Sequence, residues 1–303
     1  MLISTIKTLI ATARPPFLIL TPAVLFVAYS VSYWQQGSID TTLALLIFIA
    51  SLSAHISVNA FNEYADFNSG LDLNTERTPF SGGSGGLPAN PSAAGAVLTL
   101  AIITLSITTL IGLYFIMIFG ISLLPIGLVG VALIYFYTIW ITKYAWLCLI
   151  TPGLAFGPIF IIGSSFVLTG SYSIAAVVAS MPIFFLTNNL LLLNQFPDIS
   201  ADKQAGRNHY LIRYGQSTAS RLFVIFNLLA YLSLIIPVCF NVLPPWILIS
   251  MMTVFLSIPT SLNVLKNHNN SSKLLPAMAQ NVAVNILTPV LMASGLLVTV
   301  HFA

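Results

Sequence analysis

Two short stretches of the sequence hold five of its seven acidic residues, and a sixth lies just after the first stretch, although the chain is otherwise almost free of charge. The first stretch, NEYADFNSGLD, spans 62–72 and is followed closely by Glu76, and the second, NQFPDISADKQAGR, spans 194–207. Carboxylate and amide oxygens are hard ligands that suit Mg²⁺ or Ca²⁺, whereas the cysteine and histidine spacing of a zinc site is missing. The acidic residues within the two stretches are Glu63, Asp66, Asp72, Asp198 and Asp202.

Each stretch pairs an asparagine with an aspartate four residues later, Asn62 with Asp66 and Asn194 with Asp198. Residues at this spacing lie on one face of a helix, one turn apart. Solvated helix ends are the simpler interpretation of a single acidic loop. That interpretation does not explain why both stretches repeat the pairing or why acids are nearly absent elsewhere, so we expect a functional site.

Basic residues close to both stretches indicate what the site would bind. Mg²⁺ usually takes one or two carboxylates, keeps several waters and completes its shell with substrate phosphates. A site for a bare cation would not need so many positive neighbours. The pattern therefore predicts a diphosphate between two facing acid clusters, with carboxylates on the metal ions and basic side chains on the phosphate oxygens. The basic residues expected nearby are Arg77, Lys143, Lys203 and Arg207.

The elements that position these residues are expected to be membrane helices. Of the 303 residues, 57% are hydrophobic and 6% charged, with a mean hydropathy of +0.96, whereas a soluble domain carries about 25% charged residues. We predict an all-α integral membrane protein, a single domain over 1–303, with nine transmembrane helices around a central cavity that opens to the cytoplasmic side. The expected spans, each of roughly 20 residues or more, are 15–35, 41–62, 93–118, 121–141, 146–168, 172–196, 219–240, 243–264 and 277–301.

The orientation follows from the positions of lysine and arginine. If the N-terminus is cytoplasmic, nine crossings place all ten of these residues on the cytoplasmic side, as the positive-inside rule requires. Both acidic stretches then lie at the cytoplasmic ends of helices, after the second and sixth spans. We therefore expect a multi-pass protein of the inner (plasma) membrane with its active site facing the cytoplasm.

At this spacing, the two stretches resemble the paired aspartate-rich motifs of the UbiA superfamily of intramembrane prenyltransferases. A third element, YFYTIWITKYAW at 135–146, looks like the Tyr-rich end of that family's fourth helix with its basic residue. The likeness covers the whole chain, from the first span to the ninth. One departure is Glu63, where many members have aspartate, so its contact with the metal could be direct or through water.

The resemblance implies transfer of a polyprenyl group from a polyprenyl diphosphate to an aromatic acceptor, within the lipid bilayer and with no nucleic-acid partner. It implies Mg²⁺ as the cofactor. The implied metal ligands are Asn62, Asp66, Asp72, Asp198 and Asp202. The residues implied for the departing diphosphate are Arg77, Lys143 and Lys203, and the implied catalytic residues are Asp66, Asp198 and Lys203.

The identity of the acceptor depends on finer features of the first stretch. Tyr64 and the Ser-Gly pair before Asp72 look more like the 1,4-dihydroxy-2-naphthoate polyprenyltransferases of menaquinone synthesis, so we expect that acceptor. The alternatives are 4-hydroxybenzoate, as in ubiquinone synthesis, or another aromatic or lipid acceptor. An alternative from another class is a cation-coupled membrane transporter, which would keep its ionisable groups near the bilayer midplane rather than at one rim.

Two further features have two interpretations each. The glycine-rich loop RTPFSGGSGGLPA at 77–89 could cradle phosphate, but it does not match the P-loop pattern, and we expect a flexible cap that supplies Arg77. His55 lies one turn before Asn59 and could hydrogen-bond a hydroxyl of the acceptor. It could equally make a contact between helices.

Overall fold

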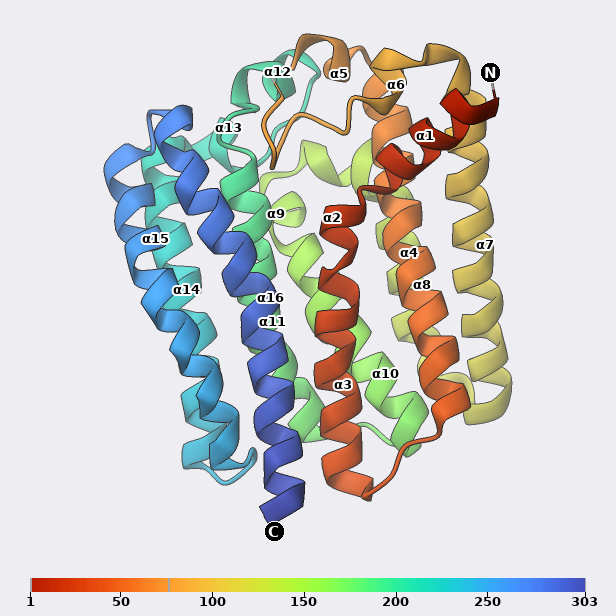
Figure 1. Ribbon diagram of the computed structural model, residues 1–303, viewed down its shortest axis with the longest axis vertical. Coiled ribbons are helices and arrows are strands. Elements are labelled where there is room, and N and C mark those ends of the chain that lie inside the picture. The colour runs from red at the N-terminus through yellow and green to blue at the C-terminus, as the bar shows by residue number, and fades with distance from the viewer. Residues whose placement is uncertain (1, 76, 303) are drawn as a thin grey trace.

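The computed structural model describes residues 2–75 and 77–302, so Glu76 lies outside the described residues. Within this part of the chain, nine helical segments are long and apolar enough to cross a membrane, which confirms the predicted all-α membrane fold. Figure 1 shows them as one bundle of long, roughly upright helices. The spans are Pro15–Gln36, Thr41–Asn68, Pro91–Phe119, Ile121–Ile139, Ala145–Thr169, Ile174–Asn194, Gln216–Cys239, Pro245–Asn267 and Ser271–Phe302.

Five short helices gather at the end of the bundle that carries the N-terminus, which we call the short-helix end (Figure 1). They are α1 (Leu2–Ala13), α5 (Leu71–Asn74), α6 (Gly86–Ala89), α12 (Ile199–Gln204) and α13 (Tyr210–Tyr214). The long helices are α2 (Pro15–Leu18) with α3 (Leu20–Gln36), α4 (Thr41–Asn68), α7 (Ala94–Phe119), α8 (Leu124–Ile139), α9 (Ala145–Leu154) with α10 (Phe160–Thr169), α11 (Ile174–Asn194), α14 (Gln216–Cys239), α15 (Val254–Asn267) and α16 (Ser271–Phe302).

Helix α4 is longer than its apolar run. The expected span ended near residue 62, whereas the helix continues to Asn68 and is stopped at Gly70, whose φ of 79° suits a residue without a side chain. The apolar run therefore marks the part of the helix within the membrane, and the acidic stretch is its continuation. This continuation fixes Asn62 and Asp66 on a rigid helix rather than on a loop.

The fifth span is interrupted beside the centre of the bundle. Pro152 lies within α9, Pro158 lies in the π-helical turn 155–159 that follows, and α10 begins after this turn. The amide of Gly153 donates to Asn188 Oδ1 on α11 at 2.7 Å, so a neighbouring helix satisfies part of the disturbed backbone. A Cβ at Gly153 would lie 2.2 Å from the carbonyl oxygen of Phe184, which explains the glycine at this close helix contact.

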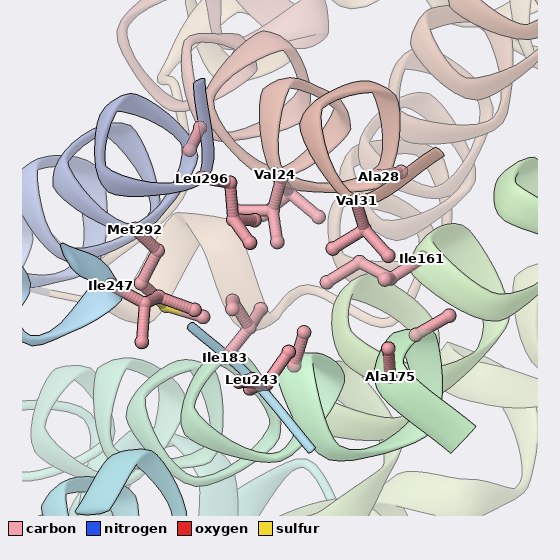
Figure 2. Packing of buried hydrophobic residues seen from close by; sticks show 14 of the residues in the cluster. Val24, Ala28, Val31, Ile161, Ala175, Ile183, Leu243, Ile247, Met292 and Leu296 are labelled. Atoms are coloured by element: carbon pink, nitrogen blue, oxygen red, sulfur yellow. The ribbon is translucent and has the colours of Figure 1, made fainter. Parts of the chain in front are cut away.

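The largest apolar core lies where α3, α10, α11 and α16 meet. Figure 2 shows Val24 and Val31 facing Ile161, Ile183 and their neighbours across this contact. On the outside, large apolar side chains such as those of Met117 and Phe255 are exposed, as expected for surfaces that contact lipid. The core thus holds one side of the bundle together.

Candidate active site

A cavity of about 550 Å³ begins among the acidic residues of the short-helix end and continues between apolar helix faces. All five residues predicted as metal ligands line it, and they come from both halves of the chain. These residues are Asn62 and Asp66 on α4, Asp72 on α5, Asp198 directly before α12, and Asp202 on α12.

Arg207 joins the two acidic stretches directly. Its Nη1 donates to Asp202 Oδ1 at 2.8 Å, and its Nη2 forms an ion pair with Asp66, 141 residues away in the sequence. His209 Nε2 lies 3.0 Å from the other oxygen of Asp202. Two carboxylates from distant helices would repel each other at close range, so the shared guanidinium is what allows them to lie together in this state.

The glycine-rich loop reaches down between the remaining carboxylates. The backbone amide of Gly82 donates to Asp198 Oδ2 at 3.2 Å. Gly83 has a φ of +73°, and a Cβ there would lie 2.7 Å from Asp72 Oδ1. Glycine is therefore required where the loop passes beside Asp72, and the loop contacts both acidic stretches as the predicted cap would.

Glu63 anchors this loop and the N-terminal segment to α4. Its side chain is fully buried, and Oε1 accepts from Arg14 Nε at 2.7 Å and from the Ser84 amide at 2.8 Å. Oε2 accepts from Ser84 Oγ at 2.6 Å. Both oxygens of Glu63 are thus engaged by protein groups, and the residue holds the cap in place.

The carboxylates not paired with arginine are electrostatically strained. Burial, followed by the nearby charges of Glu63 and Asp66, raises the pKa of Asp72 to about 7. Burial, followed by the charge of Asp202, raises the pKa of Asp198 to about 7. Asp72 Oδ2 and Asp198 Oδ1 are buried without a hydrogen-bond partner among the described residues, which leaves both oxygens in need of a cation or a proton.

This donor set fits a hard divalent cation that is shared with a substrate. Two unpaired carboxylate oxygens and the amide oxygen of Asn194, which also lacks a partner among the described residues, are oxygen ligands of the kind Mg²⁺ prefers. Among the described residues, no three His, Cys, Asp or Glu side chains are grouped so that they could hold a metal ion alone. Substrate oxygens and water would have to complete the shell.

The basic residues divide into two groups. Arg77, Lys143 and Lys203, predicted to hold the diphosphate, are exposed and are absent from the described lining of the cavity. Arg14 and Arg207 do line it. From the sequence, Arg14 was only one of the ten basic residues that set the orientation, and His209 was not identified. The one available signal for Arg14 was its position directly before Pro15 and Pro16, at the membrane end that carries the acids.

Beyond the acidic end, the cavity is mostly apolar and passes between α4, α7, α8 and α10. The aromatic ring of Phe156 and side chains such as Leu113 and Val131 line this part. Tyr137 lines the cavity nearer the acidic end, next to Thr138, which accepts a hydrogen bond from Asn62. The apolar walls of the cavity suit a flexible hydrocarbon chain, and its aromatic faces can stabilise a nearby positive charge.

A membrane bundle with a charged rim and an apolar interior defines a class of enzymes that act on a molecule with an ionic head and a lipid-like tail. The sequence profile of the UbiA prenyltransferase family matches residues 23–297, and the chain belongs to this family. Members of this family transfer prenyl groups, so the chain is an enzyme rather than the cation-coupled transporter considered as the alternative.

Similar proteins agree with this assignment. The 1,4-dihydroxy-2-naphthoate octaprenyltransferase of Bacillus subtilis is 29% identical over 271 residues, which cover 86% of this chain and 83% of that protein. The apo structure of a UbiA homologue from Aeropyrum pernix K1 superposes with a TM-score of 0.72 at 15% identity, over 95% of this chain and 99% of that one. A UbiA homologue from Archaeoglobus fulgidus, bound to DMAPP and Mg²⁺, gives a TM-score of 0.57 at 15% identity over 93% and 98% of the two chains.

The anchoring role of Glu63 can be tested with Glu63→Gln. Loss of the charge should weaken the hydrogen bonds from Arg14 and Ser84 and raise the equilibrium constant for loop opening by about tenfold, since charge-assisted hydrogen bonds contribute roughly 1.5–3 kcal/mol. Limited proteolysis should then cut the 77–89 loop faster than in the parent protein. Asp40→Asn is the matched control, because Asp40 caps the other end of α4 by accepting from the Leu43 amide. Equal protection of the loop in both variants would contradict the anchor.

The raised pKa values of Asp72 and Asp198 predict a pH-dependent affinity for Mg²⁺. Below about pH 7 both carboxyls hold protons, which the metal must displace, so the apparent dissociation constant should rise as the pH falls. The rise should be up to about tenfold per pH unit for each carboxyl. Calorimetric titration of Mg²⁺ with pyrophosphate at pH 6, 7 and 8 measures it, and an affinity that does not change across this range would show that neither carboxyl competes with the metal.

Proposed function

We propose that this chain transfers a polyprenyl group from polyprenyl diphosphate to 1,4-dihydroxy-2-naphthoate, with Mg²⁺, in menaquinone synthesis. The main observation behind this proposal is that Asp66 and Asp202 both pair with the guanidinium of Arg207, at the rim of a mostly apolar cavity. The name of the Bacillus subtilis relative supports the acceptor. We further propose a single domain over 1–303 in the inner (plasma) membrane, with this rim on the cytoplasmic side.

The acidic end is where the diphosphate would bind. Asn62, Asp66, Asp72, Asp198 and Asp202 would hold the metal, and when bound, Mg²⁺ would supply positive charge that stabilises the departing diphosphate. Of these, Asp66 and Asp198 are the predicted catalytic residues, one from each stretch. Arg207, which already lies between Asp66 and Asp202, is placed to pair with phosphate oxygens once those carboxylates have another cation.

The exposed basic residues lie beside residues of this site, and Lys143 directly follows Thr142, which lines the cavity. Lys203 follows Asp202 directly on α12, and Arg77 lies against the cap, with its Nη1 only 2.6 Å from where a Cβ of Gly85 would be. From these positions Arg77, Lys143 and Lys203 would hold the diphosphate as it departs toward solvent. In the proposed reaction, Lys203 also acts with Asp66 and Asp198 in cleavage of the donor.

The apolar part of the cavity would control what the activated prenyl group meets. Cleavage of the allylic C–O bond concentrates negative charge on the diphosphate and leaves a delocalised cation on the prenyl chain. The faces of Tyr137 and Phe156 line the cavity and can stabilise that cation. The wall here is mostly aliphatic and aromatic and disfavours water, so the cation reacts with the aromatic acceptor rather than with water.

Turnover of defined acceptors tests this proposal. Purified protein in nanodiscs is incubated with radiolabelled polyprenyl diphosphate, Mg²⁺ and either 1,4-dihydroxy-2-naphthoate or 4-hydroxybenzoate. We expect a prenylated naphthoate-derived product that disappears when EDTA removes the metal. Asp66→Ala and Asp198→Ala should each lower the rate by about 100-fold or more, the usual cost of removing a group that stabilises developing charge.

Asp40→Ala is the control, since Asp40 lies at the far end of α4 from these carboxylates. Prenylation of 4-hydroxybenzoate alone would contradict the naphthoate acceptor. Product formation that is indifferent to EDTA, or full activity of Asp66→Ala, would contradict the proposed site.

A further inference from the structure

Arg14 has an unusual backbone for a residue with a side chain. It lies between α1 and α2 with φ 54° and ψ 60°, in the left-handed region. This conformation is unfavourable for residues other than glycine and persists mainly where surrounding contacts impose it, often at functional sites. Its effect here is to direct a cation at the start of the first span into the wall of the cavity.

The side chain of Arg14 is held rigidly but only in part. Glu63 engages Nε and Nη2, and this carboxylate is fully buried while the arginine side chain keeps 25% of its surface accessible. A guanidinium carries five N–H groups in one plane. The described contacts use Nε and Nη2, so the N–H groups of Nη1 can donate to another anion. The orientation of the guanidinium is nevertheless fixed by Glu63.

His55 offers a second polar group on the same wall, deeper in the cavity. Its Nδ1 lies 2.9 Å from Thr21 Oγ1 on α3, and its ring meets Phe156 edge-on, with centroids 4.8 Å apart. Both contacts fix the ring, and His55 lines the cavity. No partner of Nε2 is described, so this nitrogen is available to a ligand.

Asn59 links these two groups. Its Nδ2 donates to the carbonyl oxygen of Ala13, the residue before Arg14, at 3.0 Å. Because His55 lies one turn before Asn59 on α4, the imidazole is about 6 Å further along the helix axis than the amide. Phe17 and Phe156 also line the cavity. A planar ligand of one or two fused rings would therefore meet a cation at one edge, a nitrogen at the other and aromatic side chains beside it.

We propose that Arg14 and His55 form the acceptor subsite and that it takes a hydroxylated aromatic carboxylic acid. The carboxylate pairs with Arg14 Nη1, and a ring hydroxyl donates to His55 Nε2. The hydrogen bond holds the ring in register and increases its electron density, while Glu63 and Thr21 position the two protein groups. This proposal rests on the proposed transfer to an aromatic acceptor and names the residues that select it.

The inner part of the proposed subsite, at His55, is distinct from the diphosphate end. His55 lies eleven residues before Asp66 on the same helix, which corresponds to about 16 Å along its axis. The acids there are paired by Arg207, whereas Arg14 is paired by Glu63. The charge of Arg14 also acts on the carboxylate of Asp72, so Arg14 borders the diphosphate end, whereas His55 is remote from it. Changes at His55 should therefore alter acceptor recognition without altering donor recognition.

Two fragments of the acceptor separate the two contacts. 2-Naphthoate carries the carboxylate but no hydroxyl, and 1,4-dihydroxynaphthalene carries hydroxyls but no carboxylate. Direct binding of each is measured calorimetrically on the parent protein in nanodiscs and on Arg14→Gln and His55→Ala. We expect Arg14→Gln to raise the dissociation constant of 2-naphthoate by about tenfold or more. We expect His55→Ala to raise that of 1,4-dihydroxynaphthalene by about threefold to tenfold. Each substitution should leave the affinity for the other fragment nearly unchanged.

Controls address folding and donor binding. Arg14→Lys keeps a cation beside Glu63 and should recover part of the 2-naphthoate affinity. Arg221→Gln, an exposed arginine on α14 that is absent from the described lining, should change neither affinity. The KM for polyprenyl diphosphate should stay within about twofold of the parent value in His55→Ala and Arg221→Gln. Equal loss of both fragments, or a raised KM for the donor alone, would overturn the subsite.

The binding assay also distinguishes this proposal from the proposed function. If the parent protein binds both fragments with the expected selectivity but transfers no prenyl group, the proposed function fails while the subsite stands. If transfer occurs and neither variant changes fragment affinity, the subsite fails while the proposed function stands.

Discussion

One guanidinium, that of Arg207, allows carboxylates from opposite halves of the chain to occupy the same buried space. Asp66 and Asp202 come from helices that are far apart in sequence, and each pairs with a different nitrogen of this side chain. Buried carboxylates without a positive partner are costly, and removal of one partner from such a group leaves an uncompensated charge. The arrangement of α4, α12 and the loop between the first acidic stretch and α7 depends on meeting this requirement.

The same requirement explains why the charged and apolar parts of the cavity are separated. Charge is confined to the short-helix end, where Asp72 and Asp198 retain unpaired oxygens, while the wall deeper between the helices is mostly apolar or aromatic, with His55 among its few polar side chains. Ionic groups at the rim stabilise a charged head, and a dry interior accommodates a hydrocarbon tail. A membrane protein can separate these two environments along one helix, and α4 does so by carrying both the apolar run and its acidic continuation.

Much of this could be predicted from sequence, for identifiable physical reasons. Long uninterrupted apolar runs define membrane helices almost independently of tertiary structure, and the four-residue spacing from Asn62 to Asp66 predicted a shared face correctly because α4 continues past the membrane. What could not be predicted depends on contacts between distant segments. Glu63 looks like one more acid of the stretch until Arg14, 49 residues earlier, is seen to pair with it.

The directions of side chains at helix ends could not be predicted from the sequence either. Lys203 and Arg207 lie four residues apart, yet the first is exposed while the second lines the cavity, because the chain turns at Gly206 (φ 77°). Sequence proximity to an acidic motif therefore identified the right neighbourhood for the basic residues without identifying which of them face inward.

Binding of Mg²⁺–pyrophosphate to Asp66→Asn, Asp198→Asn and the double variant measures the central claim most directly, because one ligand then reports on both acidic stretches. If the two stretches bind a single metal–diphosphate unit, either substitution should remove most of the affinity and the second should add little. The coupling energy should be roughly 1 kcal/mol or more, as expected for residues that share a partner. Losses that add independently would contradict convergence on one site.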